Sequence, residues 1–172
     1  MAWISLLDTS SFEFGTIADR GLPFSSGTPT GKSIKIAGKH DAYLATPPED
    51  KAHKDVALLY IPDVIGIWQN SQLMADQFAA NGYLTIIIDV FNGDPISLNR
   101  DEGFDFMKWL NEGSTGDNPH TKEAVDPIIV DAIKALQDEY GAKKIGALGY
   151  CFGAKVKWRP DASICHSTFV LN

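Results

Sequence analysis

The sequence has few cysteines, a shortage of basic residues and no long apolar run, and each shortage excludes a class of protein. Its two cysteines cannot build the disulfide framework of a small secreted domain, which favours a reducing, cytoplasmic setting. With 15 Lys and Arg against 22 Asp and Glu, the net charge of -7 argues against a nucleic-acid partner. No stretch is apolar for long enough to cross a bilayer, so we expect no membrane partner.

Two continuous apolar runs, residues 56–61 and 83–89, predict strands that are buried on both faces of a parallel sheet. Between these runs, Ser71 is placed to cap a helix that ends at residues 81–82, where Asn and Gly favour a helix C-terminus. Strand, helix and strand in this order predict a βαβ unit.

A second apolar pattern, with steps of three and four over residues 125–136, predicts a helix that ends near residues 140–141. Asp126 and Pro127 predict where this helix begins, because proline is favoured at the first helical position. The apolar residues 145–148 then predict the next strand of the sheet.

The first readable element is a short antiparallel hairpin, predicted from residues 33–36 and 41–46, which turns near Gly38 and forms an edge of the sheet. The whole pattern indicates an α/β fold, in which helices cover both faces of a mostly parallel sheet. We expect one domain over residues 27–172, preceded by a variable N-terminal extension over residues 1–26.

The most informative pattern is GYCFG at residues 149–153, which follows the last predicted strand and reads Gly-x-nucleophile-x-Gly. Gly149 and Gly153 fit a tight strand-to-helix elbow, because a Cβ at either position would collide with neighbouring backbone. Cys151 then stands at the start of a helix, which favours a thiolate and stabilises a developing oxyanion. The alternative is a buried, inert cysteine that packs as a small apolar residue.

Three segments in the right order resemble the dienelactone hydrolase family, especially its fungal branch: residues 63–68 (DVIGIW), 75–83 (ADQFAANGY) and 149–155 (GYCFGAK). The likeness begins near residues 27–32 (GTPTGK) and covers most of the chain. It implies an α/β-hydrolase fold, here incomplete at the C-terminus, without a cofactor or a metal. The activity it implies is hydrolysis of a small ester or lactone by a cysteine nucleophile, in fungal specialised (secondary) metabolism.

Residues 63–66 follow directly after a predicted strand, in the loop that donates the second oxyanion N–H in elbow hydrolases. The backbone N–H groups of Val64 and Phe152 are therefore the candidate oxyanion hole. The resemblance also places an acidic residue, Asp63, close to the resting thiol. The alternative interpretation of Asp63 is that it only opens a turn after Pro62.

An elbow hydrolase carries its acid and its histidine after the nucleophile, in that order. His40, His53 and His120 all precede the elbow, and we expect them to be solvated surface residues. Asp161 and His166 follow it, but they are too close in sequence to lie on loops after different strands. The resemblance instead matches His166 to the end of the strand after the elbow helix. The triad acid and base are thus missing from their expected places.

Two functions remain open, and whether the chain is an active enzyme is left undecided. The first is the ester or lactone hydrolase described above. The second is a truncated, catalytically silent relative that binds a small molecule, partners a homologue or is a gene remnant. Truncating a parallel sheet exposes a strand edge, so we also expect possible self-association through that edge.

Three further segments bear on these functions. Lys155, Lys157 and Pro160 predict that the helix after the elbow is short. Cys165 is expected to be a buried cysteine and not a redox partner of Cys151. The aromatic and apolar residues within 104–110 either cap a substrate pocket or pack as a helix on the core. No arginine follows Asp89 until Arg100, which disfavours a substrate carboxylate.

Overall fold

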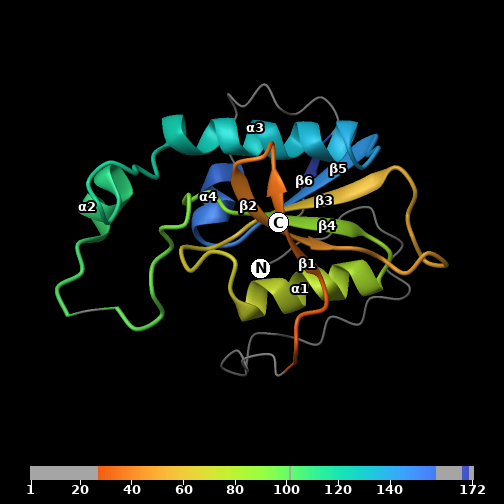
Figure 1. Ribbon diagram of the computed structural model, residues 1–172, viewed down its shortest axis with the longest axis horizontal. Helices are drawn as coiled ribbons and strands as arrows, with labels where there is room; N and C mark the ends of the chain where they lie inside the picture. The colour runs from red at the N-terminus through yellow and green to blue at the C-terminus, as the bar shows by residue number, and fades with distance from the viewer. Residues whose placement is uncertain (1–26, 101, 158–167, 171–172) are drawn as a thin grey trace.

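The computed structural model describes residues 27–100, 102–157 and 168–170 (Figure 1). Six strands and four helices are described in these ranges. In chain order they are β1 (Lys32–Ile36), β2 (His40–Ala45), β3 (Val56–Ile61), α1 (Gln69–Ala80), β4 (Leu84–Ile88), α2 (Phe106–Glu112), α3 (Lys122–Asp138), β5 (Lys144–Gly149), α4 (Phe152–Lys157) and β6 (Thr168–Val170).

The described strands form one sheet in the order β1-β2-β4-β3-β5-β6. Strands β4, β3, β5 and β6 are parallel to one another, whereas β2 is antiparallel to both β1 and β4. Helices α1 and α3 lie on opposite faces of this sheet (Figure 1). The predicted α/β architecture is confirmed, and the predicted hairpin forms an edge, with Gly38 in its turn at φ +70°.

Alternating residues of the central strands enter two separate cores. Leu59 and Ile86 belong to the core that α3 covers, whereas Leu58 and Ile87 belong to the core that α1 covers. All four side chains are at most 5% exposed, although they point to opposite faces. This two-sided burial explains why the sequence of β3 and β4 is apolar without alternation.

Helix α1 begins two residues before the predicted cap. Ser71 lies inside the first turn, and its Oγ accepts the Trp68 N–H at 3.0 Å. The Ser71 hydroxyl also donates to the carbonyl oxygen of Trp68 at 2.8 Å. The prediction that Ser71 is the N-cap was therefore wrong. Ser71 is the third residue of the helix, and its hydroxyl bonds back to the N-cap residue Trp68.

Helix α3 also begins earlier than predicted, at Lys122 and not at Asp126. Pro127 lies inside the helix, where it removes one backbone hydrogen bond. The Val125 N–H already bonds to the Thr121 carbonyl at 3.0 Å, and the Val125 side chain is fully buried. Packing of this first turn against the core outweighs the preference of proline for the first helical position.

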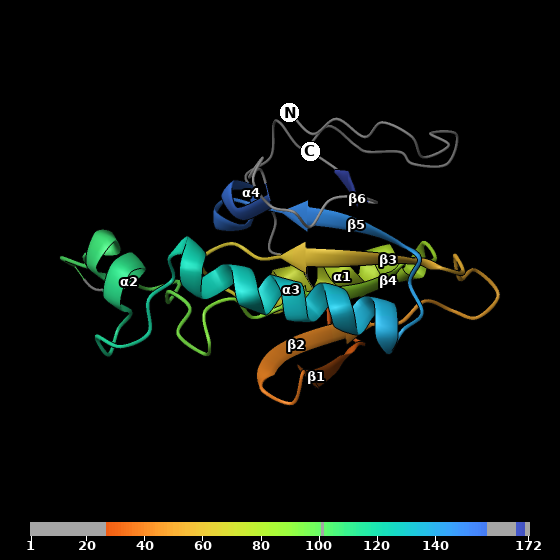
Figure 2. The same ribbon diagram turned by 90° about the horizontal axis from the view of Figure 1, so that it is seen from above.

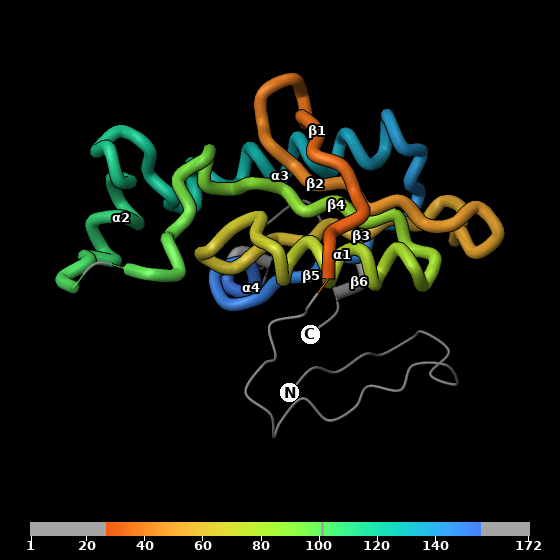
Figure 3. The backbone as a smooth tube through the Cα atoms, turned by 60° about the horizontal axis from the view of Figure 1, so that its bottom comes forward, coloured from red at the N-terminus to blue at the C-terminus, as the bar shows by residue number. Residues whose placement is uncertain are grey.

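The parallel strands point their carboxyl ends toward α2 and α4 (Figure 2). Helix α2 lies beyond the sheet at this end, on a segment that projects from the domain (Figures 2 and 3). In folds of this class, ligands bind beyond the carboxyl ends of the strands. Among the described residues, no helix combines the length and the apolar character that a membrane crossing needs.

Candidate active site

Cys151 stands between the end of β5 at Gly149 and the start of α4 at Phe152. Its backbone has φ +51°, a conformation that residues other than glycine rarely adopt. Strain of this kind is found in the turn that presents the nucleophile of elbow hydrolases. Cys151 is exposed and forms no disulfide, so the alternative of a buried, inert cysteine is not what the structure shows.

The two glycines of the elbow are required by close backbone contacts. A Cβ on Gly149 would lie 2.5 Å from the carbonyl carbon of Gly153. A Cβ on Gly153 would lie 2.1 Å from the carbonyl oxygen of Ile61 and 2.9 Å from that of Pro62. The start of α4 therefore packs directly on the end of β3, and this contact brings the elbow against the loop that follows β3.

That loop is closed by the side chain of Asp63. Its Oδ1 accepts the Ile65 N–H at 2.8 Å, and its carbonyl oxygen accepts the Gly66 N–H at 3.0 Å. Burial raises the pKa of Asp63, against the opposing effect of hydrogen bonds from Ile65, Trp68 and Gly66. Asp63 thus does open a turn, and it is also a half-buried carboxyl at the carboxyl end of β3.

The two predicted oxyanion donors are the backbone N–H groups of Val64 and Phe152. Within the described ranges, neither the Val64 N–H nor the Phe152 N–H has a hydrogen-bond partner. The Phe152 N–H opens α4, where the first N–H groups of a helix have no intrahelical partner, and free backbone donors of this kind suit a developing oxyanion. This arrangement joins a nucleophile elbow to a donor loop at one end of the sheet.

The model of the dienelactone hydrolase family matches residues 40–163, which is more than half of the chain. The chain belongs to the dienelactone hydrolase family. Hydrolase tropI of Talaromyces stipitatus is 38% identical over 133 residues, which are 76% of this chain and 51% of that protein. Dienlactone hydrolase 2 of Gibberella moniliformis is 39% identical over 140 residues, which are 77% of this chain and 56% of that protein.

The fold of this dienelactone hydrolase family member is the α/β-hydrolase fold. The structure of a candidate dienelactone hydrolase from Klebsiella pneumoniae matches it with a TM-score of 0.52 at 17% identity. That match covers 75% of this chain and 52% of the other chain. The chain spans about half the length of the curated relatives it matches.

Two of the three described histidines lie away from the elbow. His53 is exposed in the loop before β3, at the amino end of the parallel strands, and its ring contacts Tyr83. His40 begins β2, and its Nε2 lies 3.3 Å from Asp131 Oδ2 on α3. Both positions agree with the predicted hairpin and loop, but the His40 side chain is only 10% exposed, so the prediction that it is solvated was wrong. Neither residue is placed beside Cys151.

His120 is buried, with 1% of its surface exposed, so the prediction of a solvated surface residue was wrong. Its Nε2 lies 3.1 Å from Asp94 Oδ2, and its ring packs 4.3 Å from that of Trp109. The Gly-, Asp- and Asn-rich sequence around it predicted a solvated loop, but this loop folds onto the segment after β4. No local pattern marks such a contact, because its two partners are 26 positions apart.

Asp94 is the centre of this contact. Burial by itself acts to raise the pKa of Asp94. Hydrogen bonds from Ser114 and His120 outweigh this effect, so the pKa of Asp94 is lowered. The Ser114 N–H donates to Asp94 Oδ2 at 2.8 Å, and the Trp109 indole N–H donates to the Asp94 carbonyl at 3.0 Å. No sequence pattern marks Asp94, because Ser114 and His120 lie 20 and 26 positions away in the chain.

Residues 104–110 were predicted either to cap a substrate pocket or to pack as a helix on the core, and the structure agrees with the second alternative in part. Trp109 is buried in the core, as expected of a packed helix, whereas Phe104, Phe106 and Met107 are exposed. Their exposed side chains lie on the segment beyond the carboxyl ends of the strands, where a substrate would bind. This segment therefore presents an apolar surface to solvent, and the buried Trp109 side chain attaches it to the core.

Other candidate groups do not add to the site. Asp161, Cys165 and His166 lie outside the described residues. A cavity of about 320 Å³ lies between the hairpin and α1, lined by Lys32, Asp76 and neighbouring residues, none of which belongs to the elbow. Nowhere in the described part of the chain are three or more His, Cys, Asp or Glu side chains grouped to hold a metal ion.

Proposed function

We propose that this chain carries the nucleophile and the oxyanion hole of a cysteine hydrolase acting on a small ester or lactone. The observation that carries the proposal is the strained, exposed Cys151 between β5 and α4. Its Sγ would attack the substrate carbonyl carbon, and the Val64 and Phe152 N–H groups would stabilise the oxyanion. Collapse expels the alkoxide and leaves a thioester, which water then cleaves to the free acid.

The mechanism also needs a base, which takes the thiol proton and gives it to the leaving alkoxide. We assign this role to no described residue, because His53 and His40 lie elsewhere and His120 is buried against Asp94. Elbow hydrolases carry the acid and the histidine after the nucleophile. The proposed hydrolase therefore relies on groups outside the described residues.

This lack of a placed base among the described histidines favours a second candidate function. In it, the chain is a catalytically silent family member that binds a small molecule or partners a homologue. Acylation of Cys151 fits both functions, whereas fast turnover after acylation fits only the first one. In both cases the exposed apolar residues of the α2 segment favour an apolar ligand over a carboxylate.

A role in fungal specialised metabolism is part of the first proposal. It is supported by the fungal relatives, tropI and dienlactone hydrolase 2, at 38% and 39% identity, against 32% for the human carboxymethylenebutenolidase homolog. A cytoplasmic location stays a prediction from the small number of cysteines.

The decisive experiment is the reaction of the chain with p-nitrophenyl acetate. We expect about one equivalent of nitrophenol in a burst, followed by slow turnover, because attack needs Cys151 but release needs a base. Cys151→Ala should abolish the burst, and Cys165→Ser should retain it. A burst of equal size in Cys151→Ala would overturn the proposal. Fast steady-state turnover that depends on Cys151 would instead exclude the silent alternative.

A further inference from the structure

The segment after β4 is a loop held by internal hydrogen bonds, which we call the support loop and define as residues 89–96. Asp89 braces it from within, because its Oδ1 accepts the Phe91 N–H at 2.8 Å and its Oδ2 accepts the Gly93 N–H at 2.6 Å. Phe91 and Ile96 are both buried. The support loop is thus anchored at the carboxyl end of β4 before it reaches any other element.

The support loop contacts both halves of the proposed oxyanion hole. The Ile96 N–H donates to the Val64 carbonyl at 2.7 Å. This hydrogen bond holds the peptide group that follows Val64 in the loop after β3. The Phe91 ring packs against the Phe152 ring with centroids 5.0 Å apart. One loop therefore backs the two residues whose N–H groups are the proposed oxyanion donors.

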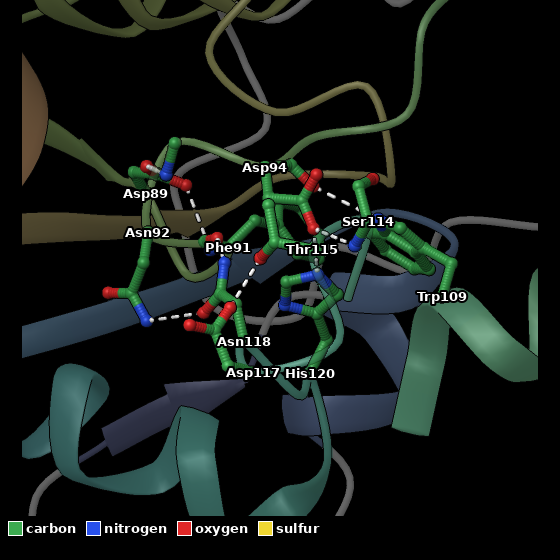
Figure 4. Close-up of polar contacts among 11 residues, drawn as sticks. Asp89, Phe91, Asn92, Asp94, Trp109, Ser114, Thr115, Asp117, Asn118 and His120 are labelled. Atoms are coloured by element: carbon green, nitrogen blue, oxygen red, sulfur yellow. Dashed lines mark hydrogen bonds and ion pairs between the residues drawn. The ribbon is translucent and has the colours of Figure 1, made fainter. Parts of the chain in front are cut away.

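A second loop, residues 113–121, forms hydrogen bonds with the support loop (Figure 4). His120 Nε2 and the Ser114 N–H both lie on Asp94 Oδ2, at 3.1 and 2.8 Å. The Asn118 side chain donates to the Phe91 carbonyl at 2.9 Å. Because a carboxylate only accepts hydrogen bonds, the Nε2 of His120 carries the proton in this contact.

The histidine at this position is costly for a purely packing role. His120 Nδ1 is buried and, within the described residues, has no hydrogen-bond partner. An unsatisfied buried polar atom destabilises the folded state, and an apolar side chain of similar size would avoid this cost. The ring nevertheless packs edge-on to Phe91 at 5.3 Å and against Trp109 at 4.3 Å. Its retained polarity therefore points to the bond with Asp94.

We propose that His120 is a positioning residue, which holds Asp94 and the support loop so that the Val64 and Phe152 N–H groups converge on the substrate oxygen. His120 itself does not touch the substrate, because it is buried, and the Phe91 ring contacts both His120 and Phe152. This inference rests on the proposed function, since it assigns a supporting contact to the same oxyanion hole.

Two reactions of Cys151 separate a positioning role from a merely structural one. Acylation by p-nitrophenyl acetate passes through an oxyanion, whereas alkylation by iodoacetamide does not. Both rates are measured in a Cys165→Ser background, so that one thiol is present. We expect His120→Leu to slow acylation about tenfold or more, as a misplaced oxyanion donor does, and to change alkylation less than about threefold.

His120→Gln retains an N–H that reaches Asp94, so it should restore most of the acylation rate. His40→Leu is the matched control, because it removes the other histidine–aspartate contact, and it should change neither rate. If His120→Leu does not fold, Asp94→Asn takes its place and should slow acylation while alkylation stays within about threefold.

Unchanged acylation in folded His120→Leu or Asp94→Asn would overturn the inference, as would an equal loss of both rates or a failure of His120→Gln to recover. The proposed function fails differently, because the parent chain with Cys165→Ser would then show no acylation at all. The two failures are therefore distinguishable in one set of measurements.

Discussion

Cys151 and Asp63 each occupy a position that stability alone would not select. Cys151 has a positive φ that a residue with a Cβ adopts at a cost of about 1–3 kcal/mol. Asp63 is a half-buried carboxyl whose pKa is raised by burial, so its charged form is disfavoured in the folded chain. Costly residues at neighbouring loops are typical of a functional site.

The first prediction concerns the reactivity of the two thiols. Cys151 is exposed at the start of α4, whereas Cys165 is predicted from the sequence to be buried. We expect iodoacetamide to label Cys151 several times faster than Cys165 in the folded chain. Mass spectrometry of the native sequence, Cys151→Ser and Cys165→Ser measures both rates. Faster labelling of Cys165 would show that the elbow does not present its sulfur.

The second prediction concerns Asp63 and pH. Because its folded pKa lies above the unfolded value, the native state binds this proton more tightly, and stability is lost as pH rises through the raised pKa. Asp63→Asn keeps an oxygen for the Ile65 N–H and removes the charge. It should therefore increase the free energy of unfolding at pH 7, and the gain should disappear below the ordinary carboxyl pKa of 3.8.

Urea unfolding at several pH values measures this difference. Asp50→Asn, at an exposed position before β3, is the control and should show little change at any pH. A loss of stability in Asp63→Asn at pH 7 would mean that the hydrogen bonds of the carboxylate outweigh its burial.

At the scale of elements, the elbow depends on the approach of α4 to the end of β3. Gly153 makes this approach possible, because its missing Cβ leaves room for the Ile61 carbonyl. The same approach sets the distance between Phe152 and the loop that carries Val64. A change at Gly153 therefore alters stability and the oxyanion hole together.

The third prediction is that Gly153→Ala lowers the free energy of unfolding by about 1–3 kcal/mol or more, the usual cost of overpacking. Alanine gains up to about 1 kcal/mol in helix propensity, which is too little to offset a clash with backbone. Gly27→Ala is the matched control, because its new Cβ meets only the flexible Leu73 side chain at 3.2 Å. Chemical denaturation compares the two, and equal stabilities would contradict the close contact.

At the scale of the molecule, the two edge strands of the described sheet differ in their protection. β1 carries Lys32 and Lys35, and charged residues on an edge discourage pairing with another chain. β6 has the sequence Thr-Phe-Val, without a charge. Pairing of the domain with a second copy is therefore expected at β6 and not at β1.

The fourth prediction follows from this difference. We expect the 172-residue chain to form oligomers whose population rises with concentration in light-scattering measurements. Phe169→Lys adds a charge to β6 and should shift the population toward monomer, whereas Ser33→Lys on β1 should leave it unchanged. A monodisperse monomer with cooperative thermal unfolding would contradict the prediction.

Much of the fold and the elbow was predictable because the signal is local. The apolar runs of β3 and β4 reflect burial on both faces, and the hairpin turn near Gly38 has a positive φ at both Ala37 and Gly38. The elbow is encoded by five consecutive residues, 149–153, and backbone contacts require glycine at the first and the last of them. Such features depend on neighbours in the chain, which the sequence states directly.

Other features were decided only by the tertiary structure, because they depend on partners far apart in the chain. The local sequence around His120 predicts solvation, but the contact with Asp94 and the packing against Trp109 bury it. Pro127 predicts a helix start, but α3 begins about one turn earlier, at Lys122, because Val125 in this first turn is buried in the core. The sequence by itself determined the elements and the nucleophile elbow, whereas long-range packing decided how the loops beside the elbow are held.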